Sequence, residues 1–286
     1  MYRFLLSGLL LTFSSTCLAQ FTYAPVDVPG AVATVARGIN NSGEVVGFYQ
    51  TTACSNYDLN VPNCPTKGFK LVNNQFTTVM VHNSTSTAVN GVNDLGDIVG
   101  FYTNSDGTGH GFIWLHTGVI ETIDNPRTIY LTIPMGINKA GSVVGGNWSI
   151  GQTGTFSEGG WVWRNGTFTA LNPGGSSNGT CCQSVNGISN NGLFAGQIFL
   201  RDFWQAWFKG KTDVDFWEFK VGDTRGTALD TSGDVTGYSS GNGAWFAPHI
   251  ESNEGTGDKE SIRFKVVSYP GSQSTQPFGM NDSRYL

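Results

Sequence analysis

Short apolar runs separated by Gly, Asn and polar pairs extend along most of the chain and predict β-strands rather than helices. One pattern, the first motif, recurs as a strand, a tight turn and a second strand. Its copies are GINNSGEVVGFY (38–49), GVNDLGDIVGFY (91–102), GINKAGSVVGGN (136–147), GISNNGLFAGQI (187–198), ALDTSGDVTGYS (228–239) and a shorter sixth, GMNDSRYL (279–286). Each full copy has a turn glycine, such as Gly43, and a second glycine four residues later, such as Gly47. We expect the first glycine to be left-handed and the second to leave room for an aromatic side chain of the next strand.

A second motif lies between these copies and begins with Gly or Ala followed by an aromatic residue. The aromatic residues are Phe69, Phe112, Trp161, Trp207 and Trp245. Turn pairs such as Asn-Asn and Asn-Gly follow, so this motif also predicts a hairpin. Two hairpins give four short antiparallel strands per unit, and the turn glycines are 53, 45, 51 and 41 residues apart.

This spacing is typical of β-propeller blades. We therefore predict an all-β, propeller-like array of four-stranded antiparallel repeats with five to six units. A β-solenoid or a two-sheet sandwich is the alternative. The sixth copy ends before its second strand, which leaves closure of the ring open.

The N-terminus differs from the rest of the chain. Arg3 precedes an apolar run from Phe4 to Phe13, and the small residues Cys17 and Ala19 follow. This order predicts a secretory signal peptide over 1–19, too short to span a membrane, followed by a single repeat-built domain over 20–286. We expect a secreted protein, either extracellular or periplasmic, without a membrane span.

Four cysteines remain beyond the predicted signal peptide: Cys54, Cys64, Cys181 and Cys182. An oxidising compartment favours pairing. Cys54 and Cys64 flank a short polar loop and are predicted to form a disulfide. The adjacent Cys181 and Cys182 leave two alternatives open, a strained vicinal disulfide or two thiols. The chain has no CxxC pair and no histidine beside these cysteines, which argues against a zinc site.

The two motifs resemble those of the HAF-type extracellular repeat family. That family pairs a GIN-x-x-G-x-[IV]-V-G-x-Y hairpin with an HGF-[LI]-[WY] strand, and the segment HGFIW from His110 to Trp114 is the nearest copy of the latter. The resemblance covers about 21–286. It implies an extracellular repeat protein, and no activity comes with it.

Charge and chemistry exclude more functions than they identify. The chain has 16 Lys+Arg against 21 Asp+Glu, a net charge of −5, which argues against a nucleic-acid binder with a basic surface. Glu44, Asp97 and Asp234 share the position after the turn glycine. They are expected either to face solvent or to converge on one face as a cation or acid–base site. No catalytic set, metal cluster or cofactor motif can be assembled, so the sequence favours a non-enzymatic role without a metal or cofactor.

Loop length predicts where function resides. The turns within the hairpins are tight and share one face of a blade, whereas the connections between hairpins are long and share the opposite face. The long connections carry all four cysteines of 20–286 and the candidate binding aromatics Tyr57, Tyr130, Trp148 and Trp204. Variable loops on a rigid scaffold commonly carry function, and aromatic side chains suit stacking on sugars. The alternative is that these aromatics only cover the blade ends.

We therefore predict a monomeric extracellular binding or scaffold module whose partner is a glycan or an envelope protein. The alternatives are a propeller-type polysaccharide lyase or glycoside hydrolase, and a structural envelope protein with no ligand.

Overall fold

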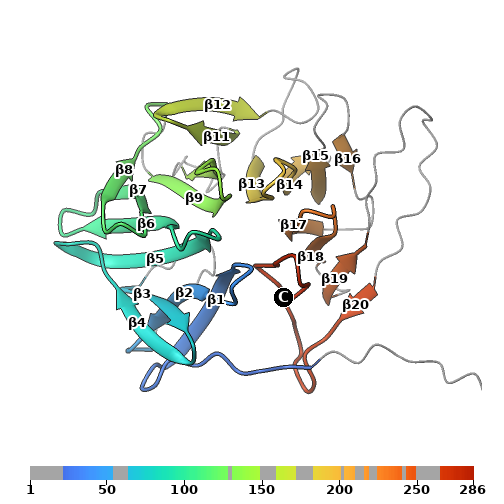
Figure 1. Ribbon diagram of the computed structural model, residues 1–286, viewed down its shortest axis with the longest axis horizontal. Helices are drawn as coiled ribbons and strands as arrows, with labels where there is room; N and C mark the ends of the chain where they lie inside the picture. Colours follow the sequence, from blue (N-terminus) through green and yellow to red (C-terminus); the bar gives the residue numbers. More distant parts are fainter. Residues whose placement is uncertain are drawn as a thin grey trace, which may run out of the picture.

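The computed structural model is a ring of five four-stranded sheets around a central axis (Figure 1). The structure describes residues 22–53, 64–127, 131–148, 159–171, 183–200, 203–209, 216–218, 224–239, 243–248 and 265–286. Strands are the only long elements in these segments, and no helix occurs in them. The predicted propeller is confirmed, with five blades.

Each blade follows chain order outward from the axis, and all its strand pairs are antiparallel. The first blade consists of β1 (Ala33–Ile39), β2 (Val45–Gln50), β3 (Lys67–Val72) and β4 (Gln75–Val79). The second consists of β5 (Ser84–Val92), β6 (Ile98–Asn104), β7 (Gly109–Trp114) and β8 (Ile120–Ile123). The third consists of β9 (Leu131–Ile137), β10 (Val143–Trp148), β11 (Gly160–Arg164) and β12 (Thr167–Leu171). The fourth consists of β13 (Gln183–Ile188), β14 (Phe194–Leu200), β15 (Phe203–Lys209) and β16 (Phe216–Glu218). The fifth consists of β17 (Thr224–Leu229), β18 (Val235–Ser239), β19 (Gly243–Ala247) and β20 (Lys265–Val267).

The predicted pairing of the second glycine with an aromatic residue is confirmed. Gly145 on β10 lies opposite Trp161 on β11, and the side chain of Trp161 is 1% exposed. A Cβ atom at Gly145 would lie 2.7 Å from the Trp161 ring and 2.1 Å from the carbonyl oxygen of Ile133, so no larger residue fits there. The equivalent pair in the first blade is Gly47 and Phe69.

The hydrophobic core lies between neighbouring blades. One cluster joins Val46 and Val79 of the first blade to Val89, Ile98 and Phe112 of the second. A further cluster joins apolar residues of the second and third blades in the same way. Each blade therefore buries its apolar faces against the next one.

The turn glycines of the five full copies have φ between 77° and 86°, as predicted for left-handed turns. In the sixth copy Arg284 takes this place, with a φ of 62°.

The sixth copy closes the ring although it forms no strand. Its Asn281 donates Nδ2–H to the carbonyl oxygen of Asn40 in the first blade, at 3.0 Å. On the other side, the backbone N–H of Thr231 in the fifth blade donates to Oδ1 of Asp282 at 2.8 Å. The last copy thus connects the fifth blade to the first, which the sequence left open (Figure 1).

The described part of the chain contains no helix that is long and apolar enough to cross a membrane.

Candidate functional site

An irregularity recurs in the innermost strand of every blade. The pairing of β1 with β2 shifts between Ala36 and Gly38, so Arg37 has no partner in the ladder. The same one-residue shift occurs in β5, β9, β13 and β17. These are β-bulges, which bend a strand locally and redirect the bulged side chain. The extra residue is always the one that precedes the first residue of the first motif.

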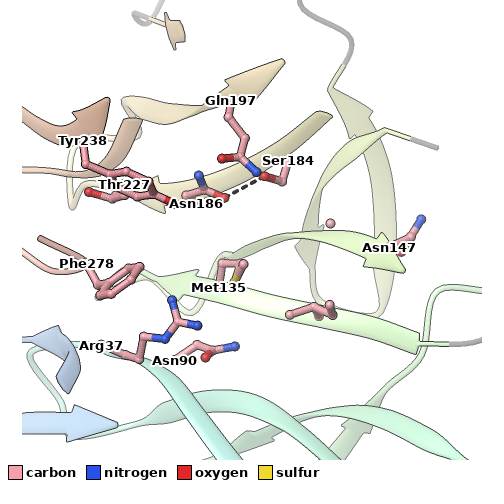
Figure 2. Close-up of a pocket in the computed structure, with 12 residues that line it drawn as sticks. Arg37, Asn90, Met135, Asn147, Ser184, Asn186, Gln197, Thr227, Tyr238 and Phe278 are labelled. Carbon is pink, nitrogen blue, oxygen red and sulfur yellow. Dashed lines mark hydrogen bonds between the residues drawn. The ribbon is translucent and has the colours of Figure 1, made fainter. Parts of the chain in front are cut away.

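We call this set the bulge residues: Arg37, Asn90, Met135, Asn186, Thr227 and, at the same position of the sixth copy, Phe278. All six line one cavity on the axis, which we call the axial cavity (Figure 2). Its volume is about 680 Å³, part of which is open to solvent. The other lining residues are Ile133, Gly146, Asn147, Ser184, Gln197 and Tyr238.

The axial cavity lies on the side of the molecule that carries the long connections. Asn147, Gln197 and Tyr238 line it from the later parts of β10, β14 and β18, which run away from the turns of the first motif. Connections between hairpins follow the ends of these strands, and the one after β10 is long, covering 149–159. The cavity therefore opens on the face where the sequence predicts function.

Amide groups in the cavity wall join neighbouring blades. Asn90 donates Nδ2–H to the carbonyl oxygen of Pro134 at 2.8 Å, and Asn186 donates Nδ2–H to that of Gly226 at 2.7 Å. The hydroxyl of Ser184 donates to Oδ1 of Asn186 (Figure 2). By contrast, Oδ1 of Asn90 is buried and has no hydrogen-bond partner among the described residues. A buried acceptor without a partner is unfavourable, and a ligand hydroxyl in the cavity would satisfy it.

Arg37 contributes a guanidinium group to the lining of the axial cavity. Arg37 is 5% exposed. Its guanidinium lies 4.3 Å from the ring centroid of Phe278 and 5.5 Å from that of Phe48. Such cation–π contacts hold the guanidinium in place. Among the described lining residues, Arg37 alone carries a charge, and none has a carboxylate, imidazole or thiol.

The opposite end of the axis is formed by the turns of the first motif, which we call the turn ring. Asn40 donates Nδ2–H to the carbonyl oxygen of Asn93 at 2.9 Å, and Asn93 does the same to Asn138 at 3.1 Å. Oδ1 of Asn40 accepts the backbone N–H groups of Ser42 and Glu44 in its own turn. One asparagine therefore caps its turn and connects two blades, which explains why this residue recurs in the motif.

The three carboxylates after the turn glycines do not converge, and they are not solvated strand starts either. Asp97 is 4% exposed and accepts Nδ1–H of His116 at 2.7 Å, while Glu44 lies 3.2 Å from Nζ of Lys70. Asp234 is fully buried and pairs with Arg284 at 2.7 Å. Both expectations are wrong because each carboxylate is held by a basic residue from another segment.

Burial raises the pKa of Asp97, but hydrogen bonds from the backbone and ring of His116 and from Asn93 outweigh it. The pKa of Asp97 is therefore lowered, and this carboxylate stays ionised in its pair.

Most of the candidate binding aromatics and cysteines predicted from the sequence lie outside the part of the chain that the structure describes. Tyr57, Tyr130, Cys54, Cys181 and Cys182 lie outside the described residues, as does the segment 1–19. Trp148 and Trp204 belong to β10 and β15, but the placement of their side chains is outside the description. Cys64 lies just before β3. The predicted disulfides and the aromatic binding face therefore stay predictions.

The axial cavity is the feature that sequence reasoning missed. Its signal was present in the position before the first motif, which holds five different residue types in the six copies. The pattern of the flanking glycines does not reveal the bulge, because one extra residue leaves that pattern unaltered. In the described part of the chain, no group of three or more His, Cys, Asp or Glu residues could hold a metal ion.

A scan against protein-family models and a search of the curated proteins found no match to this chain.

Proposed function

We propose that this protein is an extracellular binding module that takes a glycan into the axial cavity. One observation carries the proposal: the cavity is lined by the position that precedes the first motif, which holds five residue types in six copies, namely Arg37, Asn90, Met135, Asn186, Thr227 and Phe278. The recurring Asn and Gly residues serve hydrogen bonding and close packing that every blade needs. The bulge residues have no such shared requirement, so their variety fits an asymmetric ligand.

The chemistry of the lining suits sugar hydroxyls. A hydroxyl donates and accepts hydrogen bonds, and amide side chains such as Asn90, Asn186 and Gln197 supply both functions. The rings of Phe278 and Tyr238 offer apolar faces on which the C–H side of a sugar can pack. The cavity therefore combines directional polar groups with aromatic faces, as small-molecule sites commonly do.

The extracellular location is supported by the apolar segment within 1–19 and by the resemblance to the HAF-type repeats. We expect export with cleavage after Ala19, which would make Gln20 the first residue of the mature protein. The predicted Cys54–Cys64 disulfide belongs to the same proposal. N-terminal sequencing of the exported protein, together with mass analysis of a non-reduced digest, tests both points.

Binding is tested with purified protein comprising residues 20–286 on an array of cell-envelope and plant polysaccharide fragments, followed by calorimetry on each hit. Gln197 extends from β14 toward Ser184 (Figure 2), so Gln197→Trp should fill the cavity and weaken binding by about tenfold or more. Leu95→Ala is the matched control, because Leu95 is 46% exposed in a turn at the opposite end of the axis. Unchanged binding by a folded Gln197→Trp protein would contradict the proposed site.

A further inference from the structure

We infer that the axial cavity is closed toward the turn ring and therefore receives the end of a linear glycan chain rather than a segment within the chain. The inference rests on the proposed function and deepens it by naming the class of ligand, a glycan with an accessible chain end.

The walls of the axial cavity come from the inner part of the ring. Its lining residues lie on the two innermost strands of a blade, apart from Phe278, which precedes the sixth copy. Hydrophobic clusters join each blade to the next from the first blade to the fifth. A ligand in the cavity therefore extends along the axis rather than outward between these blades.

On the turn-ring side of the bulge residues, the inner strands are in contact with one another. A Cβ atom at Gly91 would lie 3.0 Å from the carbonyl oxygen of Met135 and 3.2 Å from Cα of Gly136 in the next blade. A Cβ atom at Gly279 in the sixth copy would lie 3.0 Å from Cα of Gly38, so the same contact occurs where the ring closes. Such a close approach requires glycine and leaves no room for a sugar ring between neighbouring strands.

The next residue of every copy is apolar and adds a second layer. These six residues line a separate hollow at the turn ring and are Ile39, Val92, Ile137, Ile188, Leu229 and Met280. Among the described residues, this hollow and the axial cavity have no lining residue in common. Sugar hydroxyls that entered the apolar layer would lose hydrogen bonds to water without gaining others, which is unfavourable.

Hydrogen bonds within the turn ring also reach across the axis. Asn190 in the fourth blade donates Nδ2–H to Oδ2 of Asp94 in the second blade at 2.8 Å. These two blades are not neighbours, so the bond spans the space at the axis (Figure 1). Asn41 donates Nδ2–H to Oδ2 of Asp94 at 3.0 Å and to Oδ2 of Asp282 at 2.8 Å. A glycan that passed along the whole axis would have to break these bonds.

A pocket that is closed at its inner end fits a chain end. An internal sugar has neighbours on both sides and needs a groove or a channel that is open at two ends, whereas a terminal sugar has a neighbour on one side only. The rest of the chain would leave the axial cavity past the ends of β10, β14 and β18. It would then extend over the face where the sequence predicts function.

The experiment measures how many protein molecules bind to one glycan chain. The probes are oligomers of linear xylan, mannan, arabinan, homogalacturonan and chitin, from the trisaccharide to the longest soluble chain. Calorimetry with the protein comprising residues 20–286 gives the stoichiometry and the dissociation constant for each length. Binding at a chain end predicts one protein per chain at every length, and a dissociation constant that becomes constant once the cavity is filled.

Two variants test whether the chain passes through the axis. Gln197→Trp fills the axial cavity and should weaken the binding of every chain length by about tenfold or more. Asn190→Ala removes the bond to Asp94 at the closed end. It should leave the dissociation constant and the stoichiometry unchanged, because a chain end in the cavity does not reach the turn ring.

The outcomes separate the two proposals. A stoichiometry that rises with chain length would overturn the chain-end inference while leaving the cavity as a glycan site, and this result requires no variant to fold. Weaker binding of long chains alone by Asn190→Ala would also overturn it, because the chain would then contact the turn ring. If none of the probes binds, the proposed function itself fails.

Discussion

The axial cavity and the turn ring are built by the same inner strands, but the polar side chains at these two ends of the axis differ in their hydrogen bonding. Arg37 and Asn40 are three residues apart, one at each end of the axis. In the turn ring, the side-chain amides of Asn40 and Asn93 form hydrogen bonds both within their own turns and to the next blade. In the cavity, the residue type changes from blade to blade, and the Oδ1 atom of Asn90 has no partner among the described residues.

This difference indicates that one position of the repeat stabilises the fold, while another position is free to vary and serves the proposed recognition of a ligand. The turn ring repeats because each blade must be joined to the next by the same bonds. The bulge lifts one residue per blade out of the ladder, so that residue can vary without breaking strand pairing. Substitutions at the two ends should therefore have different consequences, and the following changes test this, from the largest expected effect to the smallest.

The largest effect is expected for the scaffold on which both ends depend. Trp161→Ala removes a ring that is 1% exposed and packs against Gly145 and Phe168. The free energy of unfolding should fall by about 3–5 kcal/mol, as for other large aromatic truncations. Urea denaturation followed by tryptophan fluorescence and circular dichroism measures this. A loss below 1 kcal/mol, as expected on a surface, would mean that the blade core is not where the structure places it.

A matched pair of variants compares the two ends directly. Asn93→Ala deletes the amide that bonds Asn138 and Asp97, leaving buried groups without partners, so it should reduce the free energy of unfolding by about 2 kcal/mol or more. Gln197→Ala, at the cavity, should change stability by less than about 1 kcal/mol but weaken glycan binding. Thermal unfolding and calorimetry are measured on both proteins. The comparison breaks down if Gln197→Ala proves the more destabilising of the two.

In the fifth blade, Asp230 replaces the asparagine of the turn ring, as Ser189 does in the fourth. Oδ1 of Asp230 accepts the N–H groups of Ser232 and Asp234, as the asparagines do in their turns. Its Oδ2 takes the place of the amide nitrogen and is buried without a hydrogen-bond partner among the described residues. Burial, and then the negative charges of Asp234 and Asp282, raise the pKa of Asp230, although backbone hydrogen bonds oppose this and Arg284 pairs with Asp234.

A raised pKa in the folded state means that the protonated form is favoured by folding. The stability that Asp230 contributes is therefore fully present below its unfolded pKa, and it is lost as the pH rises through the folded pKa. Asp230→Asn restores the amide and should stabilise the protein at pH 7 by about 1 kcal/mol, with no gain at low pH. Melting temperatures from pH 3 to pH 8 test this. A constant difference between the two proteins over that range would contradict it.

The smallest effect on stability is expected for the predicted aromatic face. Trp148→Ala and Trp204→Ala should weaken glycan binding about tenfold if these side chains border the cavity entrance. Their melting temperatures should stay close to that of the unaltered protein. A fall in melting temperature with full binding would show that these aromatics cover the blade ends.

The regular parts of the molecule were predictable because they are encoded locally. The turn glycines and the Gly145–Trp161 type of pair follow from a recurring pattern that spans only a few residues. The bulges were not predicted, since a single inserted residue leaves the neighbouring apolar positions intact. The environment of Asp97 was misjudged because its partner His116 lies on a different hairpin, 19 residues away. Closure could not be predicted, because Asn281 and Asn40 are 241 residues apart.

The contact between Asn281 and Asn40 also links the proposed ligand binding to the order of folding steps. Loop-closure entropy makes the joining of such distant segments slow, so the ring is expected to close after the individual blades have formed. Arg37 and Phe278 belong to the two sides of this junction, and their contact exists only in the closed ring. A ligand that binds in the axial cavity, as proposed, would bind the closed form alone and would therefore shift the equilibrium away from the open form by mass action. Hydrogen exchange at the junction should slow as ligand is added, even though none of the exchanging amides needs to touch the ligand.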